Sequence, residues 1–178
     1  KTKSKKSLII LIDRIVSKFS FKFNKVIFES FYFPKNEYLK ICLKHKLIPS
    51  RYSNFFDFDI KENNLENDNK RIKLKNLLME VNTEDQFIKF LLFNLHKDIP
   101  KSYLENFNSI KKSVLPFAKR KKIIFSMHSI SFNDTFKVYI AETKKFGSKY
   151  IHVPHGGGLT FNHDPYFNHV EKISDKVI

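Results

Sequence analysis

The sequence has little cysteine and little glycine. The lone cysteine, Cys42, excludes an internal disulfide and fits a reducing compartment such as the cytoplasm. The apolar run Leu8–Ile12 is too short to span a bilayer and lacks the length and cleavage site of a secretory signal. Of the four glycines, three are consecutive, Gly156–Gly158. A chain this poor in glycine that places three in a row is shaping one particular loop.

The sequence also lacks the common enzyme motifs. It contains no Walker phosphate loop, no Gly-x-Gly-x-x-Gly, no Gly-x-Ser-x-Gly and no Cys-x-x-Cys. Five of the seven histidines lie in the last third of the chain, at His128, His152, His155, His163 and His169. Their spacing matches no familiar zinc pattern, so we predict no metal site.

Acidic residues are scarce relative to basic ones. There are 33 Lys and Arg against 18 Asp and Glu, a formal charge of +15. Clustered positive charge would indicate nucleic-acid binding, but here the lysines are scattered apart from Lys1–Lys6 and Lys119–Lys122. No nucleic-acid-binding signature accompanies them, which favours a solvated surface over a specific nucleic-acid site. Peripheral contact with an anionic membrane or an anionic nucleotide substrate remains open.

The pattern of apolar residues predicts alternating strands and helices. We expect buried strands at Val26–Phe28, Ile123–Phe125 and Tyr150–Val153. We expect helices at Leu8–Phe19, Pro34–His45, Arg71–Met79, from Thr83 (a capping-box position) to Pro100, from Tyr103 toward Ile110, and from Asn133 or Asp134 to Gly147. The polar stretch Asp57–Lys70 is typical of a surface loop. Strand, helix, strand within about thirty residues is a βαβ unit, which implies an α/β fold with a parallel sheet.

The last predicted strand runs directly into His155 and the three glycines. Backbone N–H groups in such a turn can approach a ligand closely, because glycine has no Cβ. The carboxyl ends of strands are also where open α/β sheets bind ligands. We therefore predict a substrate cleft with His155 at its edge; the alternative is a flexible turn that carries an ordinary histidine.

Several short motifs in this chain resemble a known family. They are, in order, Glu29-Ser-Phe-Tyr-Phe-Pro34, Leu47-Ile-Pro49, Ile99-Pro100 with Tyr103-Leu-Glu105, Asp134-Thr-Phe-Lys137 with Ala141, Gly147-Ser-Lys149, His155-Gly-Gly157 and Glu171-Lys-Ile-Ser-Asp175. In this order they resemble transferases of bacterial surface-carbohydrate loci. Those are similar to glycosyltransferases with two Rossmann domains (GT-B) and, more distantly, to capsule, Kdo and glycerophosphate transferases with a His-Gly motif. The resemblance runs from about Phe28 to the end; Pro154 stands where the family usually has Gln.

The resemblance implies a Rossmann-like parallel sheet flanked by helices, as the N-terminal half of a GT-B-like two-domain transferase. Residues 1–178 would then be one acceptor-side domain of a longer protein, with an interdomain linker starting near 160–178. The nucleotide-binding domain would follow, and the 178 residues alone are expected to have little activity.

The implied reaction transfers a sugar, or a polyol phosphate, from a nucleotide-activated donor to a bacterial surface glycan or lipid-linked acceptor. The reaction would occur in the cytoplasm, and one variant of the hypothesis places it at the inner face of the membrane. No cofactor is expected in this part of the protein. By position, His155 would be the general base. The substrate-binding candidates are Gly156, Gly157, Gly158, Asp134, Lys137, Glu171 and Asp175.

Two alternatives accompany this hypothesis. The four charged candidates have ordinary explanations, namely helix capping, a solvated charge or a surface salt bridge. The chain could also be a non-enzymatic basic module that binds nucleic acid or an anionic membrane surface. Such a module would show steeply salt-dependent affinity for polyanions.

Overall fold

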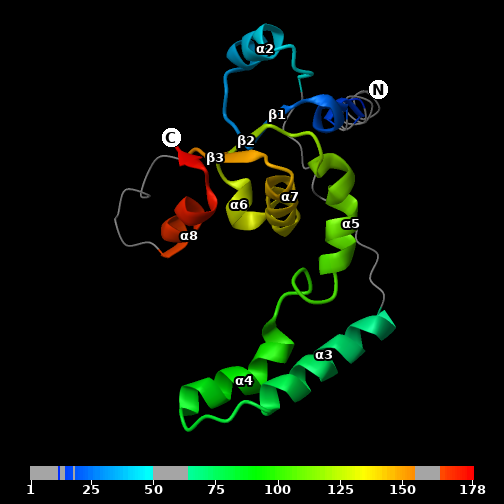
Figure 1. Cartoon of the computed structure of the whole chain (residues 1–178), viewed down its shortest axis with the longest axis vertical. Coiled ribbons are helices and arrows are strands. Elements are labelled where there is room, and N and C mark those ends of the chain that lie inside the picture. The colour runs from blue at the N-terminus through cyan, green and yellow to red at the C-terminus, as the bar shows by residue number, and fades with distance from the viewer. Residues whose placement is uncertain (1–11, 13–14, 18, 50–63, 155–164) are drawn as a thin grey trace, which may run out of the picture. The chain divides into compact units, whose positions relative to one another are not determined.

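A computed structural model describes residues 12, 15–17, 19–49, 64–154 and 165–178 (Figure 1). Residues 15–17 and 19–23 are helical, so the predicted first helix continues past Phe19. The later elements are β1 (Val26–Glu29), α2 (Lys35–Lys44), α3 (Asn64–Met79), α4 (Gln86–Asp98), α5 (Phe107–Ala118), β2 (Ile123–Ser126), α6 (Ser129–Phe132), α7 (Asp134–Lys145), β3 (Lys149–His152), α8 (Pro165–Ile173) and β4 (Lys176–Val177). None of the described helices is both long and apolar enough to cross a membrane.

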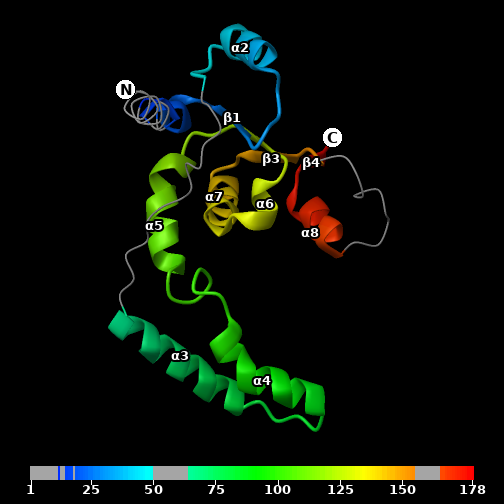
Figure 2. The same ribbon diagram turned by 180° about the vertical axis from the view of Figure 1, so that it is seen from behind.

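The strands form one parallel sheet in the order β1-β2-β3-β4. Helix α7 connects β2 to its parallel neighbour β3, so the predicted βαβ unit is present. Figures 1 and 2 show α6 and α7 on one face of this sheet and α2 on the other. The predicted α/β fold, a Rossmann-like parallel sheet flanked by helices, is confirmed.

The face toward α7 is the tightly packed one. Its strand residues alternate with the sheet's period of two and include Ile27, Ile124 and Tyr150, which are at most 3% exposed. The α7 residues Phe136 and Tyr139 are fully buried as well. Burial of these large side chains stabilises the packing of α7 on this face of the sheet.

The opposite face carries a cluster of aromatic rings. Phe28 and Phe125, on adjacent strands, stack with ring centroids 5.0 Å apart. Phe31 and Phe33 follow β1 in the chain and lie edge-on to Phe28, both at 5.7 Å. Tyr38 of α2 stacks on Phe33 at 6.3 Å. The aromatic residues of the motif after β1 thus attach α2 to the sheet.

Lys121, just before β2, is buried with 4% exposure. Its ammonium donates to the main-chain carbonyl of Phe21 and, at 2.7 Å, to that of Asn24, at the end of the first helical segment. A cation there satisfies carbonyls that have no partner within the helix. Burial lowers the pKa of Lys121 from 10.5 to about 8.

This burial predicts a pH-dependent stability. The unfolded chain binds the Lys121 proton more tightly than the folded chain, so the free energy of unfolding rises as pH increases from about 8 toward 10.5. Between pH 7.5 and 10 we expect a gain of about 2 kcal/mol that Lys121→Met lacks. Urea unfolding of both proteins at the two pH values measures it. Equal changes in the two proteins would show that the folded state does not disfavour the charged lysine.

The contacts divide the chain into two compact units. The first comprises Lys1–Phe58 and Ser113–Ile178 and contains the sheet; the second is Asp59–Lys112. Residues 165–173 form α8 and 176–177 pair with β3, within the stretch where we expected a linker to begin. The single domain over 1–178 stays a prediction.

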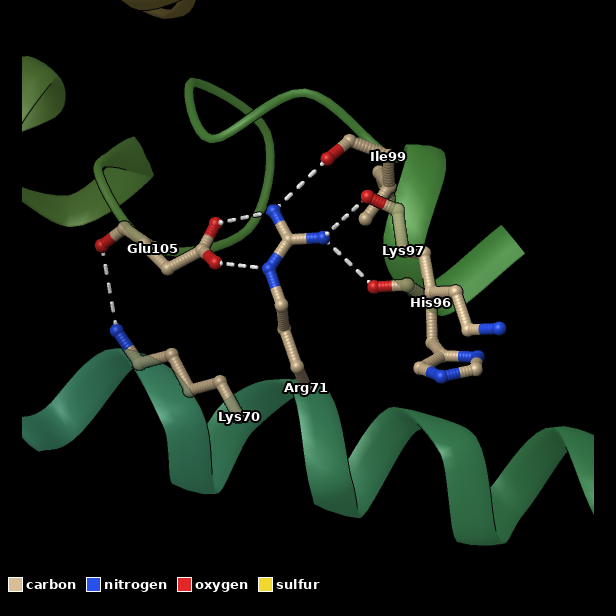
Figure 3. Close-up of polar contacts among 6 residues, drawn as sticks. All are labelled: Lys70, Arg71, His96, Lys97, Ile99 and Glu105. Carbon is tan, nitrogen blue, oxygen red and sulfur yellow. Dashed lines mark hydrogen bonds and ion pairs between the residues drawn. The ribbon is translucent and has the colours of Figure 1, made fainter. Parts of the chain in front are cut away.

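In the second unit, Arg71 joins α3 to the end of α4 (Figure 3). Its guanidinium donates to the carbonyls of His96 (2.6 Å), Lys97 (2.9 Å) and Ile99 (2.9 Å). It also pairs through two nitrogens with the carboxylate of Glu105, whose side chain is 1% exposed. Burial raises the pKa of Glu105, but hydrogen bonding and the charge of Arg71 outweigh it and leave the pKa below its usual value.

Three helix predictions in this unit need correction. Helix α3 already begins at Asn64, inside the predicted loop, because helix formation is cooperative and the contacts of α3 with α4 support it. The N-cap of α4 is Asp85, not Thr83, because the Asp85 carboxylate accepts from the amides of Phe87 and Ile88. Helix α5 begins at Phe107, after turns at 101–105.

Candidate functional site at the carboxyl edge of the sheet

Three strands end in buried polar residues that lie side by side. Glu29 closes β1, Ser126 closes β2 and His152 closes β3, and each is aligned with its neighbour in the strand register. They are 5%, 0% and 2% exposed. All three are on the face that carries Ile27, Ile124 and Tyr150 one pleat earlier, so the core changes from apolar to polar at the carboxyl edge.

Glu29 is connected to two serines. The hydroxyl of Ser129, at the start of α6, donates to Glu29 Oε1 at 3.2 Å. Ser30, the residue after β1, lies with its Oγ 2.5 Å from Ser129 Oγ. Ser30 also has a positive φ of 58°, which is unusual for a residue other than glycine. A buried carboxylate and a half-buried hydroxyl are thereby joined in one hydrogen-bond chain.

Two further titratable groups are shifted at this edge. Burial lowers the pKa of His152; a hydrogen bond to the Ser126 main chain opposes this, and the charge of His128 adds to it. His152 Nδ1 is 3.5 Å from the hydroxyl of Tyr150. Burial, with a contribution from the negative charge of Glu29, raises the pKa of Tyr139. At neutral pH, His152 is therefore a neutral imidazole and Tyr139 keeps its proton.

The remaining member of the row, Ser126, has a buried hydroxyl without a hydrogen-bond partner among the described residues. Together these groups offer a carboxylate, hydroxyls and a neutral imidazole. This set can hydrogen-bond to a polar ligand and transfer protons. Within the described ranges no three His, Cys, Asp or Glu side chains are grouped to hold a metal ion.

The predicted catalytic histidine and its glycines lie outside the described residues. His155 and Gly156–Gly158 follow β3 in the sequence, after Val153 and Pro154. The Val153 amide donates to the Ser126 carbonyl at 3.0 Å, so the described chain continues along β2 past the last residue of β3. His155 as the general base stays a prediction.

Two of the charged candidates pair with each other at the start of α7. Lys137 donates to Asp134 at 2.8 Å, and both side chains are about one-third exposed. Asn133, not Asp134, caps the helix by accepting from the Phe136 amide at 2.9 Å. Gly147 follows the helix with a φ of 80°, as predicted for the position after the last turn. Substrate binding by Asp134 and Lys137 remains untested.

The other two candidates lie on and after α8. Glu171 is exposed on the helix. Asp175 accepts from the Tyr150 amide at 2.7 Å and from Lys144 at 2.9 Å, so it connects the chain before β4 to β3 and α7. Burial raises the pKa of Asp175, but the hydrogen bonds from Lys144 and Tyr150 and the charges of Lys144 and Lys149 outweigh it and lower the pKa. Asp175 thus has a structural role, whatever its role toward a substrate.

The sequence did not single out Glu29, Ser126, Ser129 or Ser30 as site residues. Glu29 and Ser30 were present only as letters in a family motif. A usable signal existed, because Glu29 and Ser126 directly follow two of the predicted apolar runs and His152 lies near the end of the third, where the carboxyl edge would be. Only the strand register shows that these ends are neighbours.

Comparison with known proteins identifies the family. Residues 1–178, the whole sequence, match the LIC12162 family transferase. The chain belongs to this family. No curated protein and no solved structure matches it. The polar carboxyl edge of the sheet, with its buried carboxylate, hydroxyl and imidazole, is the candidate site of this LIC12162 family transferase.

Proposed function

We propose that this LIC12162 family transferase moves a sugar, or a polyol phosphate, from a nucleotide-activated donor to a surface-glycan or lipid-linked acceptor. The observation that carries the proposal is the buried row Glu29, Ser126 and His152 at the carboxyl edge of a parallel sheet. Open α/β sheets bind their ligands at this edge. The family supports transfer chemistry, and the motif resemblance supplies the donor and acceptor classes.

In such a transfer an acceptor hydroxyl attacks the donor, and its proton must leave as the new bond forms. A histidine suits this role because an ordinary imidazole titrates near the working pH. We assign it to His155, which follows β3 in the sequence. The buried His152 is less suited, because its lowered pKa makes it a weaker base.

The charge distribution is compatible with an anionic donor. The unit that contains the sheet has 23 Lys and Arg against 9 Asp and Glu, whereas the Asp59–Lys112 unit has 10 against 9. Almost all of the excess positive charge therefore lies in the unit that forms the candidate site. A field of this sign attracts phosphate-bearing substrates.

Release of nucleotide tests the proposal. The protein encoded by the complete gene is incubated with a panel of nucleotide-activated sugars and polyols, with and without membrane glycolipid extract, and free nucleotide is quantified. We expect release with at least one donor that increases on adding the extract. If no donor is consumed and the protein instead binds heparin and DNA with a steep salt dependence, the basic-module alternative replaces the transferase reaction.

A further inference from the structure

We propose that the Ser30 side chain binds a hydroxyl or ammonium group of the acceptor by accepting a hydrogen bond from it. That the ligand is the acceptor substrate rests on the function proposed above. The direction of the hydrogen bonds at Ser30, which we call the polarity of the site, rests on the structure. Ser30, Ser129 and Glu29, from the turn after β1, the start of α6 and the end of β1, form the chain that sets this polarity.

The direction of the hydrogen bonds follows from counting protons. Ser129 has a single hydroxyl proton, and it is donated to Glu29 Oε1. In the 2.5 Å contact between the two serines, Ser30 must therefore be the donor. With its proton committed inward, Ser30 Oγ can only accept from a further group. No described residue donates to it.

The negative charge of Glu29 stabilises hydrogen bonds that run from Ser30 through Ser129 to the carboxylate. The carboxylate is 5% exposed, and a buried negative charge gains more from an aligned chain of hydroxyl dipoles than it would in water. This hydrogen-bond chain polarises Ser30 Oγ and makes it a stronger hydrogen-bond acceptor.

The backbone of Ser30 adopts a left-handed conformation. A left-handed conformation costs an ordinary residue roughly 1 kcal/mol relative to glycine, and such residues concentrate at ligand sites. The conformation keeps Ser30 beside Ser129, in the turn at the carboxyl edge of the sheet. Within this hydrogen-bond chain, Glu29 and Ser129 are 5% and 8% exposed, whereas Ser30 is half-buried.

The direction of these hydrogen bonds also determines which chemical group of a ligand Ser30 can bind. A site that accepts hydrogen bonds and lies two hydroxyls from a buried carboxylate repels phosphate and carboxylate oxygens, which have no proton to donate. It favours O–H and N–H donors. The group bound by Ser30 is therefore a hydroxyl or an ammonium, not a phosphate of the donor, and we assign it to the surface-glycan or lipid-linked acceptor.

Ser30→Gly is the sharpest test variant. Glycine removes the hydroxyl and suits the positive φ, so the fold should be retained. Lys46→Gly is the matched control, because Lys46 is exposed and has a φ of 52° after the end of α2. With the donor and acceptor found in the nucleotide-release assay, we expect Ser30→Gly to raise the acceptor KM about tenfold with kcat and the donor KM little changed. Lys46→Gly should match the wild type.

Deoxy analogues of the acceptor identify the contact. One analogue should lose about tenfold in kcat/KM with the wild-type protein and almost nothing with Ser30→Gly, because the partner hydroxyl is already gone. An unchanged acceptor KM in Ser30→Gly, or equal losses with both proteins for every analogue, would overturn the inference while leaving the transferase reaction intact. Absence of turnover by the wild type is the distinct outcome that defeats the proposed function and, with it, this acceptor role.

Discussion

Replacing Arg71 by Ala is expected to destabilise the second unit by about 3 kcal/mol. The substitution leaves the nearly fully buried Glu105 carboxylate without its guanidinium partner. It also removes the donor to three carbonyls at the end of α4. Breaking a buried pair from one side is costly, because the remaining charge stays desolvated. Arg71→Lys should recover little, since one ammonium cannot reproduce the planar fork between carboxylate and carbonyls.

Amide hydrogen exchange measures this effect within the unit. We expect the slowest-exchanging amides of α3 and α4 to exchange about a hundredfold faster in Arg71→Ala, whereas those of β1 to β3 change little. Lys73→Ala is the control, because Lys73 is an exposed cation two positions further along α3. Unchanged exchange in Arg71→Ala would mean that α3 and α4 are held together by other contacts.

Replacing His155 by Ala is expected to reduce turnover by at least a hundredfold. A general base that takes the acceptor proton during attack contributes to the rate of the chemical step more than to binding, so kcat should fall and the substrate KM values should remain similar. The loss is measured in the nucleotide-release assay with the protein encoded by the complete gene. The thermal unfolding midpoint should stay within about a degree of the wild type.

His169→Ala is the matched control, because it removes an imidazole from an exposed position on α8. We expect wild-type turnover from it. Turnover by His155→Ala close to that of the control would show that the base is another residue. The buried Glu29 would then be examined next, through the pH dependence of kcat in Glu29→Gln.

The sheet was predictable from the sequence because its signal is local. The predicted runs Val26–Phe28, Ile123–Phe125 and Tyr150–Val153 are strands within one residue at each end. Helix α7 was equally predictable, because Gly147 marks its end. The order of the strands follows the chain, so neighbours in sequence are neighbours in the sheet.

The second unit was less predictable because its contacts are not local. Arg71 and Glu105 are 34 positions apart, and no periodicity relates them. In the first unit, the contact of Lys121 with the carbonyl of Asn24 was unpredictable for the same reason. In α4, the apolar residues Phe87 and Phe90 are 65% and 62% exposed. A pattern of apolar residues predicts a helix without saying what packs against it.

Only part of the candidate site could be predicted from the sequence. The run of glycines after a predicted strand drew attention to His155, and these residues follow β3 in the sequence. The sequence assigned no role to Glu29 or Ser126, because a polar residue that ends a strand becomes part of a site only when the register aligns it with others. Asp175 shows the converse, a motif residue whose contacts are structural.

Hydrogen exchange of the full-length protein with and without substrates shows whether the carboxyl edge of the sheet binds them. The nucleotide-activated donor and the acceptor are added separately and together. We expect slower exchange at the residues that follow β1, β2 and β3, around Ser30, His128 and Val153, with α3 and α4 unchanged. Protection confined to α3 and α4, or to the opposite ends of the strands near Lys25 and Lys122, would contradict this expectation.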